Sequence, residues 1–451
     1  MIEFIRQILP YLFILFFLVK GLKHPIYFLG ILFLIFMSES IFFENVGLFK
    51  IPGRFGTARM LMWMIIFWIL PILVRIYSDE NVGFILRRLN ILDYFIIGLM
   101  LISLLGLIIV LVEYSKITGV FVEFFTLLSL FAGYLIIKFW SSHYQPEVLK
   151  DFLFSLVIIN TIASVLYILH QGLGIKIYQL PEYSEEYIQG ATITRTFWFM
   201  PQFLIFSVAF TLVFRKKGSF LLTVLLIINL LAIFITYTRS ALINAVIIFI
   251  LYSILVGLKK RRLVLVLKNV LIYCLMAIFG LVILSKALPT STQFFMSRFD
   301  ELSSSSKSFQ PNNLEYRFIM TGYVISNIDQ NKIVFGEGPV TVTQSATVPA
   351  MKLATSDMVW TGVIFRWGFT GLILFILLYV FSIVISFNLY MKSEGIISDF
   401  ALMLLLYIIS QIIESFVSWT FMSGHGFATG LWYFAMLSAL IGLNKKTGII
   451  V

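Results

Sequence analysis

The chain has 451 residues, is 60% hydrophobic and carries charged side chains at only 12% of its positions, with a mean hydropathy of +1.00. Because a soluble domain carries about 25% charged residues, this composition excludes an ordinary water-soluble enzyme. The formal net charge is +11, but many basic residues lie in short clusters beside apolar segments, which is typical of membrane topology rather than of nucleic-acid binding.

Long apolar runs recur along the whole chain. Most are long enough for a helix to cross about 30 Å of hydrocarbon, and backbone groups in lipid must be satisfied within their own segment. We therefore predict an all-α fold, a polytopic integral membrane protein with about 12–13 transmembrane helices in a single membrane domain over residues 1–451. The first span is short, and it can pair with the second as one broken element. The predicted spans are 7–20, 25–43, 59–76, 93–112, 119–140, 151–170, 198–214, 219–237, 240–257, 264–287, 360–390, 398–420 and 427–443.

Short basic links between these spans set the predicted orientation. By the positive-inside rule they face the cytoplasm. Alternation then makes residues 171–197 an extracytoplasmic loop and residues 288–359 a large extracytoplasmic loop, which is expected to contain short helices. Such an elaborated outer face indicates that function is carried out there. The basic links are 215–218, 259–262, 391–392 and 444–446.

Three arginines are predicted on the outer side, against the positive-inside bias. Arg195 ends the first outer segment, Arg239 occupies a tight turn between two spans, and Arg317 lies in the large segment. Arginine is planar, permanently charged and forked, so three of them would bind the diphosphate of a lipid-linked substrate well. For each residue alone, the alternative is that it reaches toward lipid headgroups. Arg239 favours the diphosphate role, because its turn is too short to hide the side chain and no acid lies nearby in the sequence.

The stretch around Arg317 predicts a helix followed by a tight turn. Asn313 is a candidate N-cap, and Glu315 suits the first turn ahead of an apolar stripe. Gly336 and Gly338 then permit a tight backbone path and the close approach of a ligand. We expect an outer-face helix with one arginine directed inward, next to this glycine turn.

Two acidic residues are candidates for chemistry. Asp357 lies directly before a span, which suits either a general base that accepts a proton from a sugar hydroxyl or an N-cap of the next helix. Glu414 lies inside a predicted span, where an acid is a functional candidate by default, although near the outer end it can also pair with a neighbour. The other outer-side carboxylates, Glu337 among them, are expected to be mostly solvated.

No metal site and no bound cofactor are predicted. The four histidines lack the spacing of metal ligands, and the sequence contains neither a Gly-rich nucleotide loop nor a serine nucleophile elbow. The single cysteine excludes an intramolecular disulfide. The energy for any reaction is therefore expected to come with the substrate, as it does with a lipid diphosphate leaving group.

Four stretches follow one another on the predicted outer side: TRTFWFMPQFL, TYTRSALI, EYRFIMTGYVISNI with VFGEGPV, and SDMVWTGVIFRWGFTGL, whose span carries Gly368 and Gly371. In this order they resemble motifs of the bacterial O-antigen polymerase and O-antigen ligase superfamily. The resemblance implies a GT-C-like, metal-independent glycosyltransferase that acts on undecaprenyl-diphosphate-linked oligosaccharides. It also implies a multi-pass protein of the bacterial inner (plasma) membrane with its active site on the periplasmic face.

The resemblance also implies roles for individual residues. Arg195, Arg239 and Arg317 would bind the diphosphate, Arg317 would also take part in catalysis, and Asp357 is the candidate base. Ligases of the family typically carry a histidine near the position of Asp357, whereas no histidine occurs between residues 171 and 424. A polymerase that joins repeat units is therefore favoured over a ligase that transfers the glycan to lipid A core or another acceptor.

A polysaccharide flippase or other transporter is the alternative from another class. It predicts internal repeats and charged residues lining a midplane cavity, whereas the sequence shows no clear repeat and only scattered charges within the spans. The expected partners are undecaprenyl-diphosphate-linked oligosaccharides and the lipid bilayer. A chain-length regulator is a further candidate partner, and no nucleic acid is expected.

Overall fold

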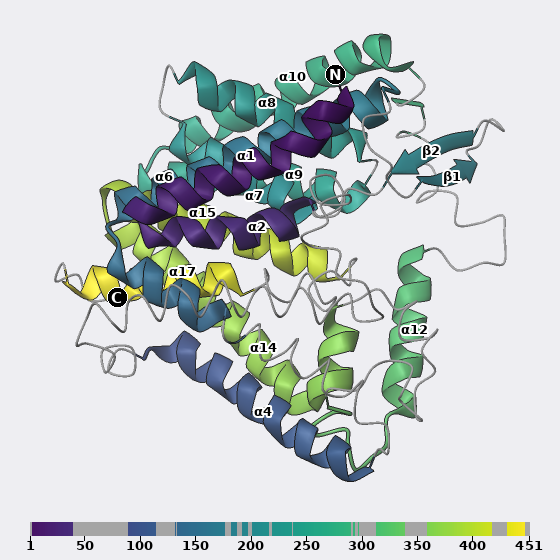
Figure 1. The fold of residues 1–451 in the computed structure, drawn as a ribbon, viewed down its shortest axis with the longest axis vertical. Coiled ribbons are helices and arrows are strands. Elements are labelled where there is room, and N and C mark those ends of the chain that lie inside the picture. The colour runs from purple at the N-terminus through teal and green to yellow at the C-terminus, as the bar shows by residue number, and fades with distance from the viewer. Residues whose placement is uncertain are drawn as a thin grey trace.

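A computed structural model gives the fold of most of the chain. The described residues form helices that run back and forth between two ends, together with one short pair of strands (Figure 1). The structure describes residues 2–38, 89–113, 131, 133–175, 182–186, 192–196, 201–215, 219–236, 238–289, 292–293, 296, 313–338, 359–416 and 431–446. The helices are α1 Ile2–Lys23, η1 Pro25–Tyr27, α2 Phe28–Ser38, α4 Ile91–Glu113, α6 Pro146–Tyr167, η5 Ile168–Gly172, α7 Pro201–Phe214, α8 Phe220–Ile235, α9 Arg239–Lys259, α10 Leu263–Ala287, α12 Asn313–Asn327, α14 Val359–Lys392, α15 Gly395–Ser415 and α17 Trp432–Lys446; residues 133–143 are helical as well.

Five of the described helices are long and apolar enough to cross a membrane, judged by length and composition. They are α4, α6 with its extension η5, α9, α14 and α15, and shorter apolar helices occur in α7, α8 and α17. These helices are consistent with the predicted α-helical membrane protein. The predicted span 59–76 and most of 119–140 lie outside the described residues, so the total of about 12–13 spans stays a prediction.

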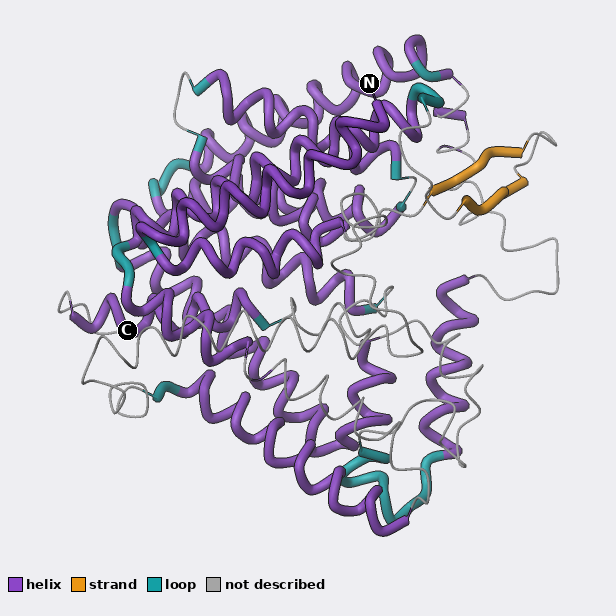
Figure 2. The backbone as a smooth tube through the Cα atoms, in the orientation of Figure 1, coloured by secondary structure: helices purple, strands orange, loops and turns teal. Residues whose placement is uncertain are grey.

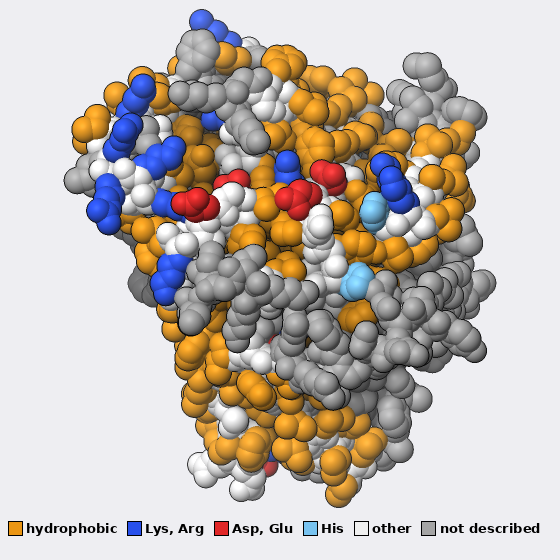
Figure 3. All heavy atoms as spheres, turned by 90° about the vertical axis from the view of Figure 1, so that its left-hand side faces the viewer, with side chains coloured by type: hydrophobic (Ala, Val, Ile, Leu, Met, Phe, Trp, Pro, Cys, Tyr) orange, Lys and Arg blue, Asp and Glu red, His pale blue; other side chains and the backbone are white. Residues whose placement is uncertain are grey.

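The two ends of the helix bundle differ in charge. Short links join α7 to α8, α9 to α10 and α14 to α15 at the end drawn on the left of Figure 1, and Lys and Arg side chains gather on this face (Figure 3). This end, hereafter the basic end, carries the charge bias that the positive-inside rule associates with one side of a membrane. Basic residues that are exposed or partly exposed there are Arg215, Lys260, Arg261, Arg262 and Lys392.

Aromatic rings and neutral polar side chains fill the interior of the bundle. Trp432 of α17 lies edge to face against Phe206 of α7, with ring centroids 4.9 Å apart. Asn160 of α6 donates a hydrogen bond to the Oδ1 atom of Asn229 of α8 at 3.2 Å, and both residues are buried. Because lipid is as apolar as the helix surfaces, tight packing and hydrogen bonds of this kind hold neighbouring membrane helices together.

Helix α14 is broken at Gly368. The sequence predicts one span over residues 360–390, whereas the structure places Gly368 at φ 61° and ψ −165°. This backbone conformation is essentially restricted to glycine. A Cβ atom at this position would lie 2.4 Å from the carbonyl carbon and oxygen of Val334. The break therefore depends on a glycine, both for its conformation and for the close approach of another segment.

The turn that follows α12 fills this break. Its backbone exchanges hydrogen bonds with both sides of Gly368, so the amides and carbonyls that the break releases find partners, as buried backbone groups require. The turn and the broken helix therefore form one unit. The hydrogen bonds run from Phe369 N to Ile333 O at 3.0 Å, from Thr370 N to Val334 O at 3.1 Å, from Glu337 N to Phe365 O at 2.7 Å, and from Gly338 N to Arg366 O at 3.2 Å.

A short hairpin departs from the predicted all-α fold. Strands β1 (Glu182–Glu186) and β2 (Thr192–Thr196) pair antiparallel, with Tyr183 opposite Arg195 (orange in Figure 2). The sequence predicts only a loop at 171–197. The β-branched threonines and isoleucine of β2 favour an extended backbone, a signal too short to stand out from the surrounding polar residues.

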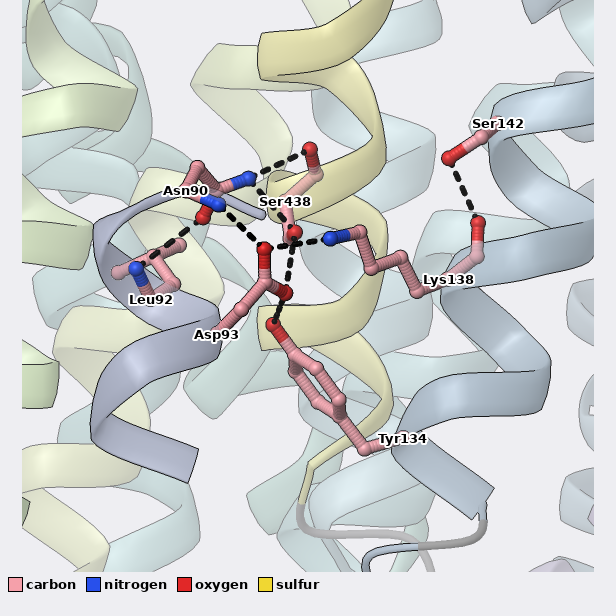
Figure 4. A network of polar contacts seen from close by, with 7 residues as sticks. All are labelled: Asn90, Leu92, Asp93, Tyr134, Lys138, Ser142 and Ser438. Atoms are coloured by element: carbon pink, nitrogen blue, oxygen red, sulfur yellow. Dashed lines mark hydrogen bonds and ion pairs between the residues drawn. The ribbon is translucent and has the colours of Figure 1, made fainter. Parts of the chain in front are cut away.

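A buried ion pair closes the basic end of the molecule (Figure 4). Asp93 at the start of α4 accepts hydrogen bonds from Lys138 Nζ at 2.5 Å, from the Tyr134 hydroxyl at 2.8 Å and from the Ser438 hydroxyl at 3.0 Å. The backbone amide of Asn90 adds a further hydrogen bond at 2.6 Å. The carboxylate thereby ties α4 to the helical residues 133–143 and to α17.

Candidate functional site

A second buried carboxylate, Glu414, lies at the opposite end of the bundle, in the last turn of α15. Its side chain accepts hydrogen bonds from Asn244 Nδ2 at 2.9 Å and from Ser240 Oγ at 3.4 Å. The residue is 7% exposed. An acid buried in a segment of this kind is costly, and it is retained where it has partners and a task.

The partners of Glu414 come from the first turns of α9. This helix begins at Arg239, directly after the tight turn, and it packs against α15. Ser240 and Asn244 are four residues apart, so they lie on the same helix face and reach the same carboxylate. Arg239 itself is partly exposed. The tight turn thus places an arginine next to the buried acid.

The charge of Arg317 also acts on Glu414. Arg317 belongs to α12, and its positive charge favours the ionised form of the Glu414 carboxylate. The helix predicted around Arg317 is present and begins at Asn313, the residue predicted as its cap. Two of the predicted arginine positions, far apart in the sequence, therefore converge on one acidic side chain.

The position of α12 depends on its contacts with α14 and α4. The hydroxyl groups of Thr321 and Thr361 are 2.7 Å apart and share a hydrogen bond between α12 and α14. Below this pair, an apolar cluster joins the two helices to α4. These contacts hold α12 beside the first part of α14 (Figure 1). The buried members of the cluster are Val110, Val324, Ile328, Ile364 and Phe365.

Gly336 and Gly338 lie in the turn that fills the break in α14. Both have φ near +79°, so the tight backbone path at these positions requires glycine. A Cβ atom on Gly336 would lie 2.5 Å from the Arg366 carbonyl carbon, and one on Gly338 would lie 2.7 Å from the Gly106 carbonyl oxygen. The close approach that these glycines permit is therefore to the backbone of α14 and α4, not to a ligand as the sequence suggests.

Glu337 is buried, contrary to the expectation that it is solvated. It is 1% exposed, and its carboxylate lies 3.4 Å from Lys332 Nζ. Arg366, which precedes the break in α14, is also buried. Sequence reasoning missed this residue because it stands alone in an apolar run, yet a single charge in such a run is itself a signal. Both residues belong to the unit that carries α12.

The remaining predicted site residues differ in what the structure says of them. Arg195 lies on β2 opposite Tyr183, and its side chain lies outside the described atoms. Asp357 lies outside the described residues. The structure therefore brings together the α9 start at Arg239 and the Arg317 helix, whereas Arg195 and Asp357 stay predictions.

The arrangement suits the binding of an anion. The tight turn, the start of a helix and two arginine-bearing elements meet at the end of the bundle that lies away from the basic links, and a helix N-terminus adds partial positive charge. Within the part of the chain that the structure describes, no group of three or more His, Cys, Asp or Glu residues could hold a metal ion. Sequence reasoning did not single out Ser240 and Asn244, although polar residues at this spacing in an apolar helix would have been a usable signal.

Comparison with known proteins adds no family to this geometry. No protein-family model matches the chain, and no curated protein matches it in sequence. The resemblance to the O-antigen polymerase and ligase superfamily therefore stays a prediction, and the argument for function depends on the residues themselves.

Proposed function

We propose that the protein is a membrane glycosyltransferase that joins undecaprenyl-diphosphate-linked oligosaccharide repeat units at the outer face of a bacterial plasma membrane. The observation that carries the proposal is the convergence of the Arg239 end of α9 and the Arg317 helix on Glu414. This meeting point lies at the end of the bundle away from the basic links, where the positive-inside rule gives no reason to retain arginines.

The diphosphate is the chemical group that such a pair of arginines suits best. A guanidinium binds phosphate oxygens through two parallel hydrogen bonds, and its charge does not depend on pH in the physiological range. A lipid-linked diphosphate would present its anionic group at the level where α9 begins. Snorkelling to ordinary headgroups needs neither a buried acid nor convergence with a second arginine-bearing helix.

In the proposed reaction, a sugar hydroxyl of one lipid-linked repeat unit attacks the anomeric carbon of the growing polymer. A carbon–oxygen bond forms with the attacking hydroxyl, and the bond from the anomeric carbon to the diphosphate breaks. The hydroxyl proton passes to a base, for which Asp357 is the candidate, and undecaprenyl diphosphate leaves with the bonding electrons. Arg239 and Arg317 would stabilise the negative charge that develops on the leaving diphosphate.

The polymerase is favoured over a ligase by the histidine distribution. No histidine occurs between residues 171 and 424, which leaves the region around Asp357 without the residue that ligases of the family typically carry. Loss of a polymerase would leave single repeat units on the acceptor, whereas loss of a ligase would leave polymer on the lipid carrier.

The test is reconstitution of purified protein with a synthetic undecaprenyl-diphosphate repeat unit, without added metal or nucleotide. We expect a ladder of polymer products, and we expect Arg239→Ala to lower turnover by about two to three orders of magnitude, as loss of a preorganised charge donor does. Lys260→Ala, at the exposed basic end, is the control and should leave turnover unchanged.

Each outcome of this test is decisive for a different statement. Absence of any ladder from the unaltered protein would overturn the polymerase proposal. Transfer to a lipid A-type acceptor in its place would identify a ligase. Full-length polymer from a folded Arg239→Ala protein would show that Arg239 does not bind the diphosphate.

A further inference from the structure

Glu414 joins two parts of the molecule that are otherwise held separately. Its carboxylate is fixed to α9 by hydrogen bonds from Ser240 and Asn244, and α9 packs within the helix bundle. The positive charge that acts on the carboxylate belongs to Arg317 of α12. A buried carboxylate is stabilised by such a combination of donors and counter-charge. The same group therefore connects the bundle to α12.

The other attachments of α12 bear on its C-terminal half. Thr321 shares its hydrogen bond with Thr361 of α14, and Val324 and Ile328 enter the apolar cluster. Arg317 lies one helical turn before the first of these contacts, in a part of α12 where Phe318 is 52% exposed. The interaction with Glu414 thus acts on the half of α12 that carries the arginine.

We propose that Glu414 is a positioning residue that holds the Arg317 guanidinium beside the Arg239 end of α9, so that both arginines meet one diphosphate. The diphosphate as ligand rests on the proposed function. Ser240 and Asn244 orient the carboxylate, and the carboxylate orients the arginine. Glu414 is therefore expected to act through Arg317 and not through contact with the reacting atoms.

The first experiment measures binding without turnover. Undecaprenyl diphosphate is titrated into the purified protein in detergent, with undecaprenol, which lacks the diphosphate, as the reference ligand. We expect Glu414→Gln to weaken undecaprenyl diphosphate binding about tenfold and to leave undecaprenol binding unchanged. Glu394→Gln is the matched control, because Glu394 is an exposed acid at the other end of the same helix.

A double-mutant cycle separates positioning from a merely structural role. If Glu414 acts through Arg317, Glu414→Gln should have little further effect in an Arg317→Gln protein, so the two changes should be strongly non-additive. A residue that only stabilises the fold would weaken both backgrounds equally. Additive effects would therefore overturn the proposal. So would unchanged binding in Glu414→Gln, and so would tighter binding, which would show that the carboxylate competes with the ligand.

The second experiment is independent of the reaction. Spin labels at Ile319 of α12 and Ile243 of α9, both exposed, report the distance between the two helices in a Cys274→Ser background. We expect Glu414→Gln to shift or broaden this distance distribution, and Glu394→Gln to leave it unchanged. An unchanged distribution in Glu414→Gln would overturn the positioning role. If the unaltered protein binds no diphosphate and makes no polymer, the proposed function fails, while the distance measurement still decides whether Glu414 places α12.

Discussion

The two buried carboxylates, Asp93 and Glu414, lie at opposite ends of the molecule and are held in different ways. Asp93 forms an ion pair with Lys138 at 2.5 Å and accepts two side-chain hydroxyl hydrogen bonds, with all of these partners in helices of the bundle. Glu414 takes its hydrogen bonds from two neutral side chains of α9, and the positive charge that acts on it comes from α12. The first carboxylate closes a joint between packed helices, whereas the second connects the bundle to a helix carried by a broken one.

This difference indicates a division of labour between the two ends. A fully satisfied buried network makes its surroundings rigid and is expensive to disturb. A carboxylate whose counter-charge sits on a separately attached helix makes the position of that helix adjustable. We therefore expect changes at Asp93 or Lys138 to alter stability first, and changes at Glu414 to alter function first.

Lys138→Met should have the largest effect on stability. It leaves the buried Asp93 carboxylate without its counter-charge, and breaking a buried pair in this way costs about 3–5 kcal/mol. Thermal unfolding of the purified protein in detergent would measure the loss, with Lys150→Met, a partly exposed residue of α6, as the control. An unfolding midpoint equal to that of the control would contradict the closed character of this end.

Gly368→Ala should come next. The alanine would have to adopt a backbone conformation that costs about 1–3 kcal/mol, and its Cβ atom would collide with the Val334 carbonyl group. Because the turn after α12 docks into this break, the variant should also lose turnover through displacement of Arg317. Gly442→Ala is the matched control, since a Cβ atom on Gly442 meets nothing within 4 Å. Equal stability of the two variants would mean that the break does not depend on glycine.

Asn244→Ala and Ser240→Ala should have the smallest effects, in that order. Asn244 donates to the charged carboxylate at 2.9 Å, so its loss should cost about 1.5 kcal/mol, whereas the Ser240 contact at 3.4 Å should contribute about 0.5 kcal/mol. Diphosphate binding should weaken in the same order as stability. The reverse order would mean that Ser240 is the main anchor of Glu414.

Much of the fold can be predicted from hydropathy alone. The observed α9 begins and ends within a few residues of the predicted span 240–257, and α12 begins at the predicted cap Asn313. Both follow from local rules, since a long apolar run must form a helix in lipid and an asparagine favours a helix start. The break at Gly368 could not be predicted in this way, because it depends on a distant turn that supplies hydrogen bonds to both sides.

The candidate site shows the same division. The charge bias of the links singles out Arg239 and Arg317 in the sequence, because arginines on the outer side need a cause. Their meeting at Glu414 needs α9, α12 and α15 to pack, and hydropathy carries no information on which helices are neighbours. Glu337 was expected in solvent for the same reason: its burial against Lys332 depends on the docked turn.

The sequence by itself determined that the protein is helical and apolar, where most helices begin and end, and which arginines stand out from the charge pattern. These features follow from local composition and from the requirement that backbone groups in an apolar medium be paired within a helix. Only the tertiary structure decided that α14 breaks at Gly368, that the turn after α12 fills the break, and that Glu414 receives Ser240, Asn244 and the charge of Arg317. The reason is physical: a buried charge and a broken helix are stable only when groups from distant parts of the chain compensate them, and those groups are brought near by packing alone.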